Sequence, residues 1–154
     1  MYCFEGYVPK VGESELDAPL SELIRASCGH GFEHSIWSDD SSEADWNKNY
    51  TTREYLDLFE AGRIHILHFD YSKQTHDVTL SLKLMFDRDT SLEIICYREP
   101  ILKSPNRRDA VRYAIDEFRV LRQVFRGSSL FVGPDTSSYP KSDTDYPNEW
   151  MKIE

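Results

Sequence analysis

The stretch VTLSLKLMF at residues 78–86 decides the fold of this chain. Apolar residues occupy every second position from Val78 to Phe86, and Thr79, Ser81 and Lys83 lie between them. Successive side chains of a strand point to opposite faces of a sheet. This period of two therefore predicts a strand with one buried face and one face that is at least partly wet.

Two further strand-like segments flank this stretch, at residues 64–71 and 92–97, and short polar segments separate the three. The close spacing predicts an antiparallel β-meander of three strands. Weaker strand patterns occur at residues 2–8 and 32–37, and residues 130–132 resemble a short final strand. We expect three to five strands in total.

Three segments have helical periodicity. The longest is expected to begin with Asn106 as N-cap and Asp109 in its first turn, and to end at Gly127. Its apolar stripe consists of Val111, Ala114, Ile115, Phe118, Leu121 and Phe125, spaced by three or four residues. Two shorter helices are expected at residues 17–28 and 51–62. The predicted fold class is α+β, with the meander packed against one long and two short helices.

A change of composition divides the chain near its end. Residues 1–132 are expected to form a single α+β domain. Residues 133–154 are rich in Pro, Ser and Asp and are predicted to form a tail that packs on the body. Tyr139, Tyr146 and Trp150 are large enough to anchor it.

The negative charge is concentrated in the first part of the chain. Residues 1–60 contain 13 acidic and 4 basic side chains, whereas residues 61–154 contain 14 of each, so the first part carries the whole net charge of −9. This polarisation disfavours nucleic acid as a partner, because phosphates would be repelled. It favours a protein partner with a basic surface, although solubility alone is an alternative explanation.

The most distinctive surface candidate is an acidic stretch bounded by aromatic residues. The residues predicted to contact a partner are Trp37, Asp39, Asp40, Glu43, Asp45 and Trp46. Aromatic anchors surrounded by charge are typical of protein-binding hot spots. Alternatively, both tryptophans belong to the core and the acidic residues only solvate the loop between them.

No catalytic or cofactor motif is recognisable, and we expect no catalytic residue, metal or cofactor. Cys28, His30 and His34 stand close together in the sequence, and His65 and His68 follow further on. They lack the paired spacing of zinc modules, so structural roles are favoured. An enzyme with a site assembled around Cys28, His30 and His34 stays open as an alternative.

The compartment is predicted from what the sequence contains at its start and in its cysteines. The first residues show no basic and apolar leader, and no window approaches a membrane span. The three cysteines are an odd, scattered set and not a disulfide framework. We therefore expect a cytoplasmic protein with no membrane association.

In size, acidity and expected architecture the chain resembles the bacterial immunity proteins, which neutralise toxins delivered between competing cells. The resemblance is one of general character. It implies a non-catalytic, stoichiometric inhibitor that covers the active site or substrate groove of a secreted toxin domain. The acidic residues from Asp39 to Asp45 would then meet a basic surface of the toxin. An adaptor or chaperone subunit that binds a larger partner through a sheet edge is a further alternative.

Overall fold

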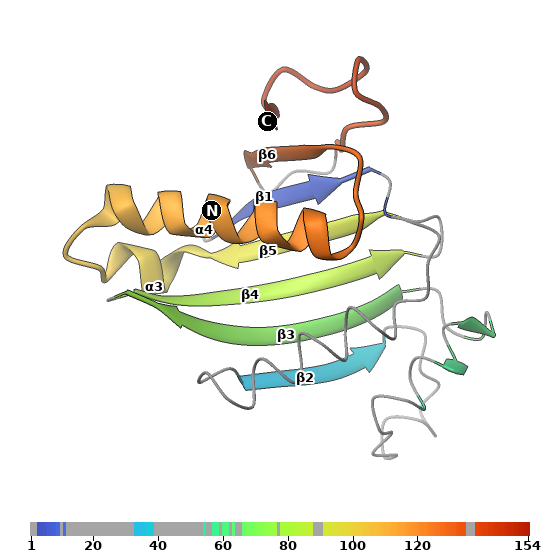
Figure 1. Cartoon of the computed structure of the whole chain (residues 1–154), viewed down its shortest axis with the longest axis horizontal. Helices are drawn as coiled ribbons and strands as arrows, with labels where there is room; N and C mark the ends of the chain where they lie inside the picture. Colours follow the sequence, from blue (N-terminus) through green and yellow to red (C-terminus); the bar gives the residue numbers. More distant parts are fainter. Residues whose placement is uncertain are drawn as a thin grey trace.

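In the computed structural model, the described part of the chain forms one antiparallel sheet of seven strands, arranged as in Figure 1. They are β1 (Cys3–Val8), β2 (Glu33–Ser38), β3 (Ile66–Thr75), β4 (Val78–Asp87), β5 (Leu92–Tyr97), β6 (Leu130–Pro134) and β7 (Met151–Ile153). Their order across the sheet is β2-β3-β4-β5-β1-β6-β7. The structure describes residues 3–9, 11, 33–38, 54, 57–58, 60–61, 63, 66–76, 78–87, 91–134 and 138–154.

The meander expected from the sequence forms the middle of the sheet. Leu84 of β4 lies opposite Phe69 of β3 and Ile94 of β5, and every second residue of β4 is buried. The strand predicted from the period of two is thereby confirmed. β1 comes from the start of the chain and lies between β5 and β6, so Gly6 is opposite both Ile94 and Val132.

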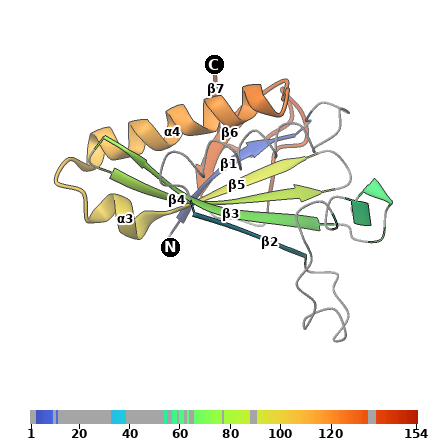
Figure 2. The ribbon, with the colours of Figure 1, turned by 60° about the horizontal axis from the view of Figure 1, so that its bottom comes forward.

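Two helices are described, α3 (Arg98–Leu102) and α4 (Arg107–Val124). The longer one, α4, lies across one face of the sheet (Figure 2). Its Asn106 N-cap is confirmed, since the Asn106 side chain accepts a hydrogen bond from the Asp109 backbone N–H at 3.2 Å. Pro100 is the third residue of α3, where the missing N–H costs no intrahelical bond.

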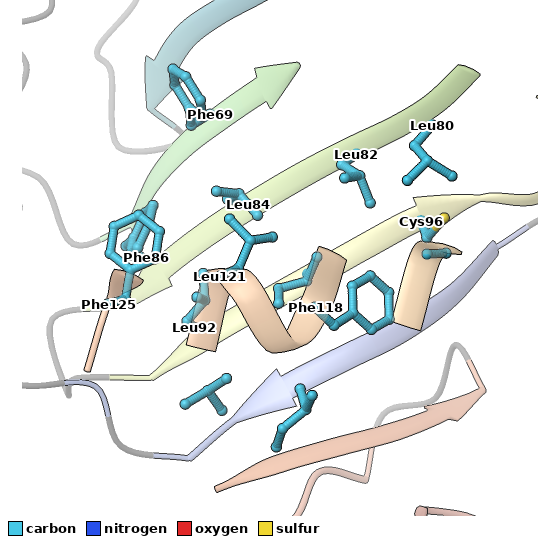
Figure 3. Packing of buried hydrophobic residues seen from close by; sticks show 14 of the residues in the cluster. Phe69, Leu80, Leu82, Leu84, Phe86, Leu92, Cys96, Phe118, Leu121 and Phe125 are labelled. Atoms are coloured by element: carbon cyan, nitrogen blue, oxygen red, sulfur yellow. The ribbon is translucent and has the colours of Figure 1, made fainter. Parts of the chain in front are cut away.

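The core lies between α4 and the sheet. Phe118 of α4 packs on Phe4, and Phe125 packs edge-on against Phe86 with ring centroids 4.8 Å apart. Figure 3 shows Phe118 and Phe125 on the side of the sheet where the leucines of β4 and β5 lie. A methyl group on Gly6 would lie 2.8 Å from the Phe118 ring, so the helix approaches β1 at a point where only glycine fits.

The predicted fold class was wrong in its number of strands and in its helices. The described residues form a sheet of seven strands instead of three to five, because short strands pair at both ends of the sheet order through contacts between distant parts of the chain. One long helix covers the sheet, and the second described helix is the five-residue α3, which the sequence did not suggest. The helix expected at 17–28 lies outside the described residues, and the segment 51–62 is described only in part.

The apolar stripe of α4 is also rotated relative to the prediction. Ala114, Phe118 and Leu121 are fully buried as expected, but Val111 is 38% exposed. Ala110 takes the buried position in the first turn instead. Within the described part of the chain, no helix is long and apolar enough to cross a bilayer.

Candidate functional site

The predicted partner-binding stretch begins at one edge of the sheet. β2 is the first strand in the sheet order and pairs with β3, which places Trp37 opposite His68. The structure describes the backbone of β2, and its last residue is Ser38. The acidic stretch follows Ser38 directly in the sequence. Its predicted contact residues Asp39, Asp40, Glu43, Asp45 and Trp46 lie outside the described residues.

The residues of the alternative catalytic site are not brought together by anything the structure describes. Cys28 and His30 lie outside the described residues, and His34 is a β2 residue opposite Tyr71. His68 is buried, with 3% of its surface exposed. Among the described residues, no group of three or more His, Cys, Asp or Glu side chains could hold a metal ion.

A partly buried aromatic cluster lies on the sheet face opposite α4. The rings of Tyr7, Tyr139 and Trp150 form a triangle, with centroids 5.1 Å apart for the two tyrosines and 6.2 Å and 5.6 Å from each tyrosine to Trp150. The Trp150 indole N–H donates to the Ser138 carbonyl at 2.8 Å. This cluster covers Gly133, where a methyl group would lie 2.6 Å from the indole. We call these rings the tail cluster.

Two carboxylates lie beneath the tail cluster. Glu93 of β5 is opposite Tyr7 of β1, and the Tyr139 hydroxyl donates to Glu93 Oε1 at 3.0 Å. Glu5 is two residues before Tyr7 on the same face and is 2% exposed. The sequence suggested that Tyr139 and Trp150 anchor the tail, but it could not reveal Glu5 and Glu93 as their neighbours, because acidic residues in strands usually face water.

The electrostatics of this cluster favour neutral phenols. Burial raises the pKa of Tyr139, and the negative charges of Glu93 and Glu5 raise it further. Burial also raises the pKa of Tyr7, with a hydrogen bond from Ser91 acting in the opposite direction. A phenol of raised pKa is a hydrogen-bond donor and a poor base or nucleophile near neutral pH. Both phenols therefore stay protonated near neutral pH, and the cluster holds the tail on the sheet.

The outer side of α4 carries a second charged region. A hollow of about 340 Å³ is lined by Arg108, Asp109, Val111, Arg112, Ile115 and Arg119. The sequence indicated only a mixed charge run on a solvated face of the helix. It could not show that Val111 and Ile115 lie partly exposed between the arginines, because their exposure depends on how α4 is rotated on the sheet.

Comparison with known protein families, curated proteins and solved structures finds no match to this chain. Function is therefore inferred from the charge distribution of the chain and from the geometry of the described residues.

Proposed function

We propose that this protein is a non-catalytic, protein-binding inhibitor, an immunity protein that binds and neutralises a cognate bacterial toxin. The single observation that carries the proposal is the charge polarisation, in which residues 1–60 account for the whole net charge of −9. A concentrated negative potential accelerates association with a basic protein surface and repels nucleic acid. Basic surfaces are expected on toxins whose substrates are polyanions.

The position of β2 supports this proposal. β2 is six residues long and pairs, among the described residues, with β3 alone. An edge strand presents unpaired backbone N–H and C=O groups, to which an extended segment of a partner can add. The acidic stretch starts where this edge strand ends. The acidic stretch would therefore speed the encounter with the partner, and the adjacent strand β2 would supply backbone groups for specific docking.

The contact residues that we assign to this surface are those singled out in the sequence: Trp37, Asp39, Asp40, Glu43, Asp45 and Trp46. The compartment that we propose is the cytoplasm, where a reducing environment keeps thiols free. The odd, scattered set of cysteines is compatible with that compartment. No cofactor or metal takes part in the proposed mechanism, which is occlusion of the toxin by stoichiometric binding.

The test uses the product of the adjacent upstream reading frame, purified as its toxin-like domain. Neutralising the acidic stretch with Asp39→Asn, Asp40→Asn, Glu43→Gln and Asp45→Asn should lower the association rate roughly tenfold at low salt. The loss should shrink as ionic strength rises, because screening removes the long-range attraction in both proteins. Stopped-flow binding and survival of cells producing the toxin domain are the two readouts.

A matched control neutralises four acidic residues of the tail. Asp143, Asp145, Glu149 and Glu154 are all exposed, and changing them to their amides alters the net charge by the same amount. If both variants lose association rate equally, the acidic stretch is not the contact surface. If the unchanged protein neither binds the toxin domain nor protects cells, the proposal is wrong.

An adaptor that docks through the sheet edge is the second candidate, favoured by the place of β2 at the end of the order of described strands. Its binding would rest on backbone hydrogen bonds more than on charge. The affinity of such a complex should persist at high salt, and the neutralised variant should bind as well as the unchanged protein.

A further inference from the structure

Helix α4 carries a basic stripe on its outer side. Arg108, Arg112, Ile115 and Arg119 are separated by four, three and four residues, so they lie along one side of the helix. Together with Asp109 and Val111 they line the hollow of about 340 Å³. We call these six residues the arginine groove.

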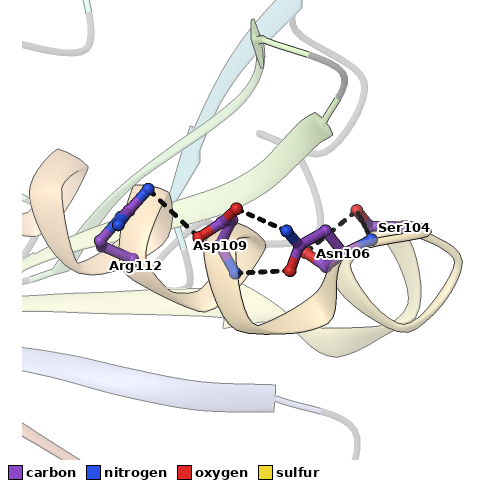
Figure 4. A network of polar contacts seen from close by, with 4 residues as sticks. All are labelled: Ser104, Asn106, Asp109 and Arg112. Carbon is purple, nitrogen blue, oxygen red and sulfur yellow. Dashed lines mark hydrogen bonds and ion pairs between the residues drawn. The ribbon is translucent and has the colours of Figure 1, made fainter.

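The arginines of the groove are available for a ligand. Arg112 pairs with Asp109 at 3.1 Å and lies over the Tyr113 ring, and Arg119 pairs with Asp116 at 2.7 Å and donates from Nε to the Glu154 carbonyl at 3.3 Å. The four side chains of the two ion pairs are nevertheless 35% to 63% exposed. Figure 4 shows the first pair at the start of α4. Exposed ion pairs of this kind are weak and exchange readily for a better partner. Arg108 is exposed and forms no ion pair with any described residue.

The groove also lies in the basic part of the chain. Residues 103–126 contain seven basic and three acidic side chains, in a protein whose net charge is −9. At physiological salt, charges more than about 8 Å apart are strongly screened. A ligand in the groove would therefore respond mainly to the charged residues that line it, which are three arginines and one aspartate.

The apolar lining restricts the chemistry of the ligand. Val111 is 38% exposed and Ile115 is partly exposed, and both lie between the arginines. A small phosphate or a nucleic-acid backbone would gain nothing from these aliphatic side chains. Guanidinium groups pair with carboxylates through two parallel hydrogen bonds. The combination fits an extended peptide that presents acidic and apolar side chains on the same face, two residues apart in its sequence.

We propose that the arginine groove binds an extended acidic segment of a partner protein, with carboxylates on the arginines and an apolar side chain on Val111 and Ile115. This surface lies on the helix that covers the sheet, and it has the opposite charge to the acidic stretch that follows β2. It is therefore a binding site in addition to the one proposed for the toxin.

The probe is a fluorescently labelled peptide that repeats glutamate, serine, leucine and serine, so that its extended form presents glutamate and leucine on one face. The same peptide with glutamine in place of glutamate is its neutral control. Fluorescence anisotropy should show binding of the glutamate peptide that weakens as salt increases, and little binding of the glutamine peptide. The variant with Arg108→Gln, Arg112→Gln and Arg119→Gln should bind the glutamate peptide at least about tenfold more weakly. Circular dichroism should show an unchanged helix content.

A charge-matched variant changes three arginines of the same helix and its C-terminal end that do not line the groove, namely Arg107, Arg122 and Arg126, each to Gln. It should bind the glutamate peptide within about twofold of the unchanged protein. Equal loss in the two triple variants would mean a diffuse charge effect and would overturn the proposal. Val111→Ser should weaken binding without changing the net charge, and an unchanged affinity would contradict the proposed apolar contact.

Two competing occupants are separated by further measurements. If inorganic phosphate or duplex DNA displaces the peptide at charge concentrations equal to those of the peptide itself, the groove is a general anion site and the proposal fails. If the protein self-associates in sedimentation experiments and the groove variant abolishes this, the occupant is a second copy of the chain. That result would also overturn the assignment to a separate partner protein.

Discussion

The Lys73 ammonium lies 2.7 Å from Glu117 Oε2 and joins strand β3 to helix α4 on the covered face of the sheet. The Glu117 side chain is 7% exposed, whereas that of Lys73 is 30% exposed. The two partners therefore depend on each other unequally. A lysine can turn its ammonium group toward water, but the Glu117 carboxylate is held where water is largely excluded.

This asymmetry predicts that Lys73→Met destabilises the protein more than Glu117→Gln does. The free energies of unfolding of the two variants should differ by about 1–2 kcal/mol, because only the first change removes the cation beside a buried carboxylate. Urea unfolding at neutral pH measures both values. The double change Lys73→Met with Glu117→Leu should recover most of the loss, since no buried charge remains. Equal losses in the two single variants would contradict this explanation.

The close contact between Gly133 and Trp150 gives a second prediction. A Cβ atom on Gly133 would lie 2.6 Å from the indole, far inside contact distance. Gly133→Ala should therefore lower the free energy of unfolding by roughly 1–3 kcal/mol, as expected for an overpacked site. In a Trp150→Leu background, which is itself less stable, the same change should cost much less. Urea unfolding of the two single variants and the double variant measures this coupling. Additive changes in the free energy of unfolding would contradict the contact between Gly133 and Trp150.

The end of α4 offers a third test, because the residue with positive φ there is not glycine. Arg126 has φ +55°, and the next residue, Gly127, donates its N–H to the Arg122 carbonyl at 2.8 Å. The left-handed conformation costs an L-residue roughly 1–2 kcal/mol. Glycine avoids this steric cost, but part of the gain is offset because glycine loses more backbone entropy on folding. Arg126→Gly should therefore raise the free energy of unfolding by about 0.5–1 kcal/mol.

His76 provides the comparison for that experiment. It also has positive φ, at +53°, but its ring stacks on Tyr113 with centroids 4.4 Å apart. His76→Gly removes this stacking as well as the strain, so its gain should be smaller than that of Arg126→Gly or absent. If His76→Gly raised the free energy of unfolding more than Arg126→Gly does, the stacking on Tyr113 would contribute nothing to stability.

The parts of this fold that the sequence predicted are those with a strong local pattern. The alternation in β4 and the Asn106 cap of α4 depend on residues a few positions apart, and both were confirmed. Val111 was predicted to be buried and is not, because helical periodicity defines an apolar arc but not how that arc is centred on the sheet.

The features that the sequence missed depend on distant contacts. β7 is only three residues long and exists through its pairing with β6, in which Ile153 lies opposite Leu130. The hydrogen bond from Tyr139 to Glu93 spans 46 residues of sequence, and no local pattern marks it. The acidic contact surface stays a prediction, because Asp39 to Asp45 lie outside the described residues.

The tail cluster gives a prediction about pH. Burial, then the charges of Glu93 and Glu5, raises the pKa of Tyr139 above its ordinary value of 10.0. When pH rises above 10, the unfolded chain therefore loses the Tyr139 proton before the folded protein does. The stabilisation linked to this proton is complete below pH 10 and is lost progressively as pH rises above it.

Tyr139→Phe removes both the hydrogen bond to Glu93 and this titration. At pH 8 the variant should be less stable than the unchanged protein by about 1 kcal/mol, the usual value of one such hydrogen bond. Above pH 10 the difference should narrow, because only the unchanged protein loses the linked stability. Urea unfolding from pH 8 to pH 11 measures the gap, with Tyr97→Phe, at an exposed tyrosine, as the control. A gap that stays constant over this range would show that Tyr139 does not hold its proton more tightly in the folded protein.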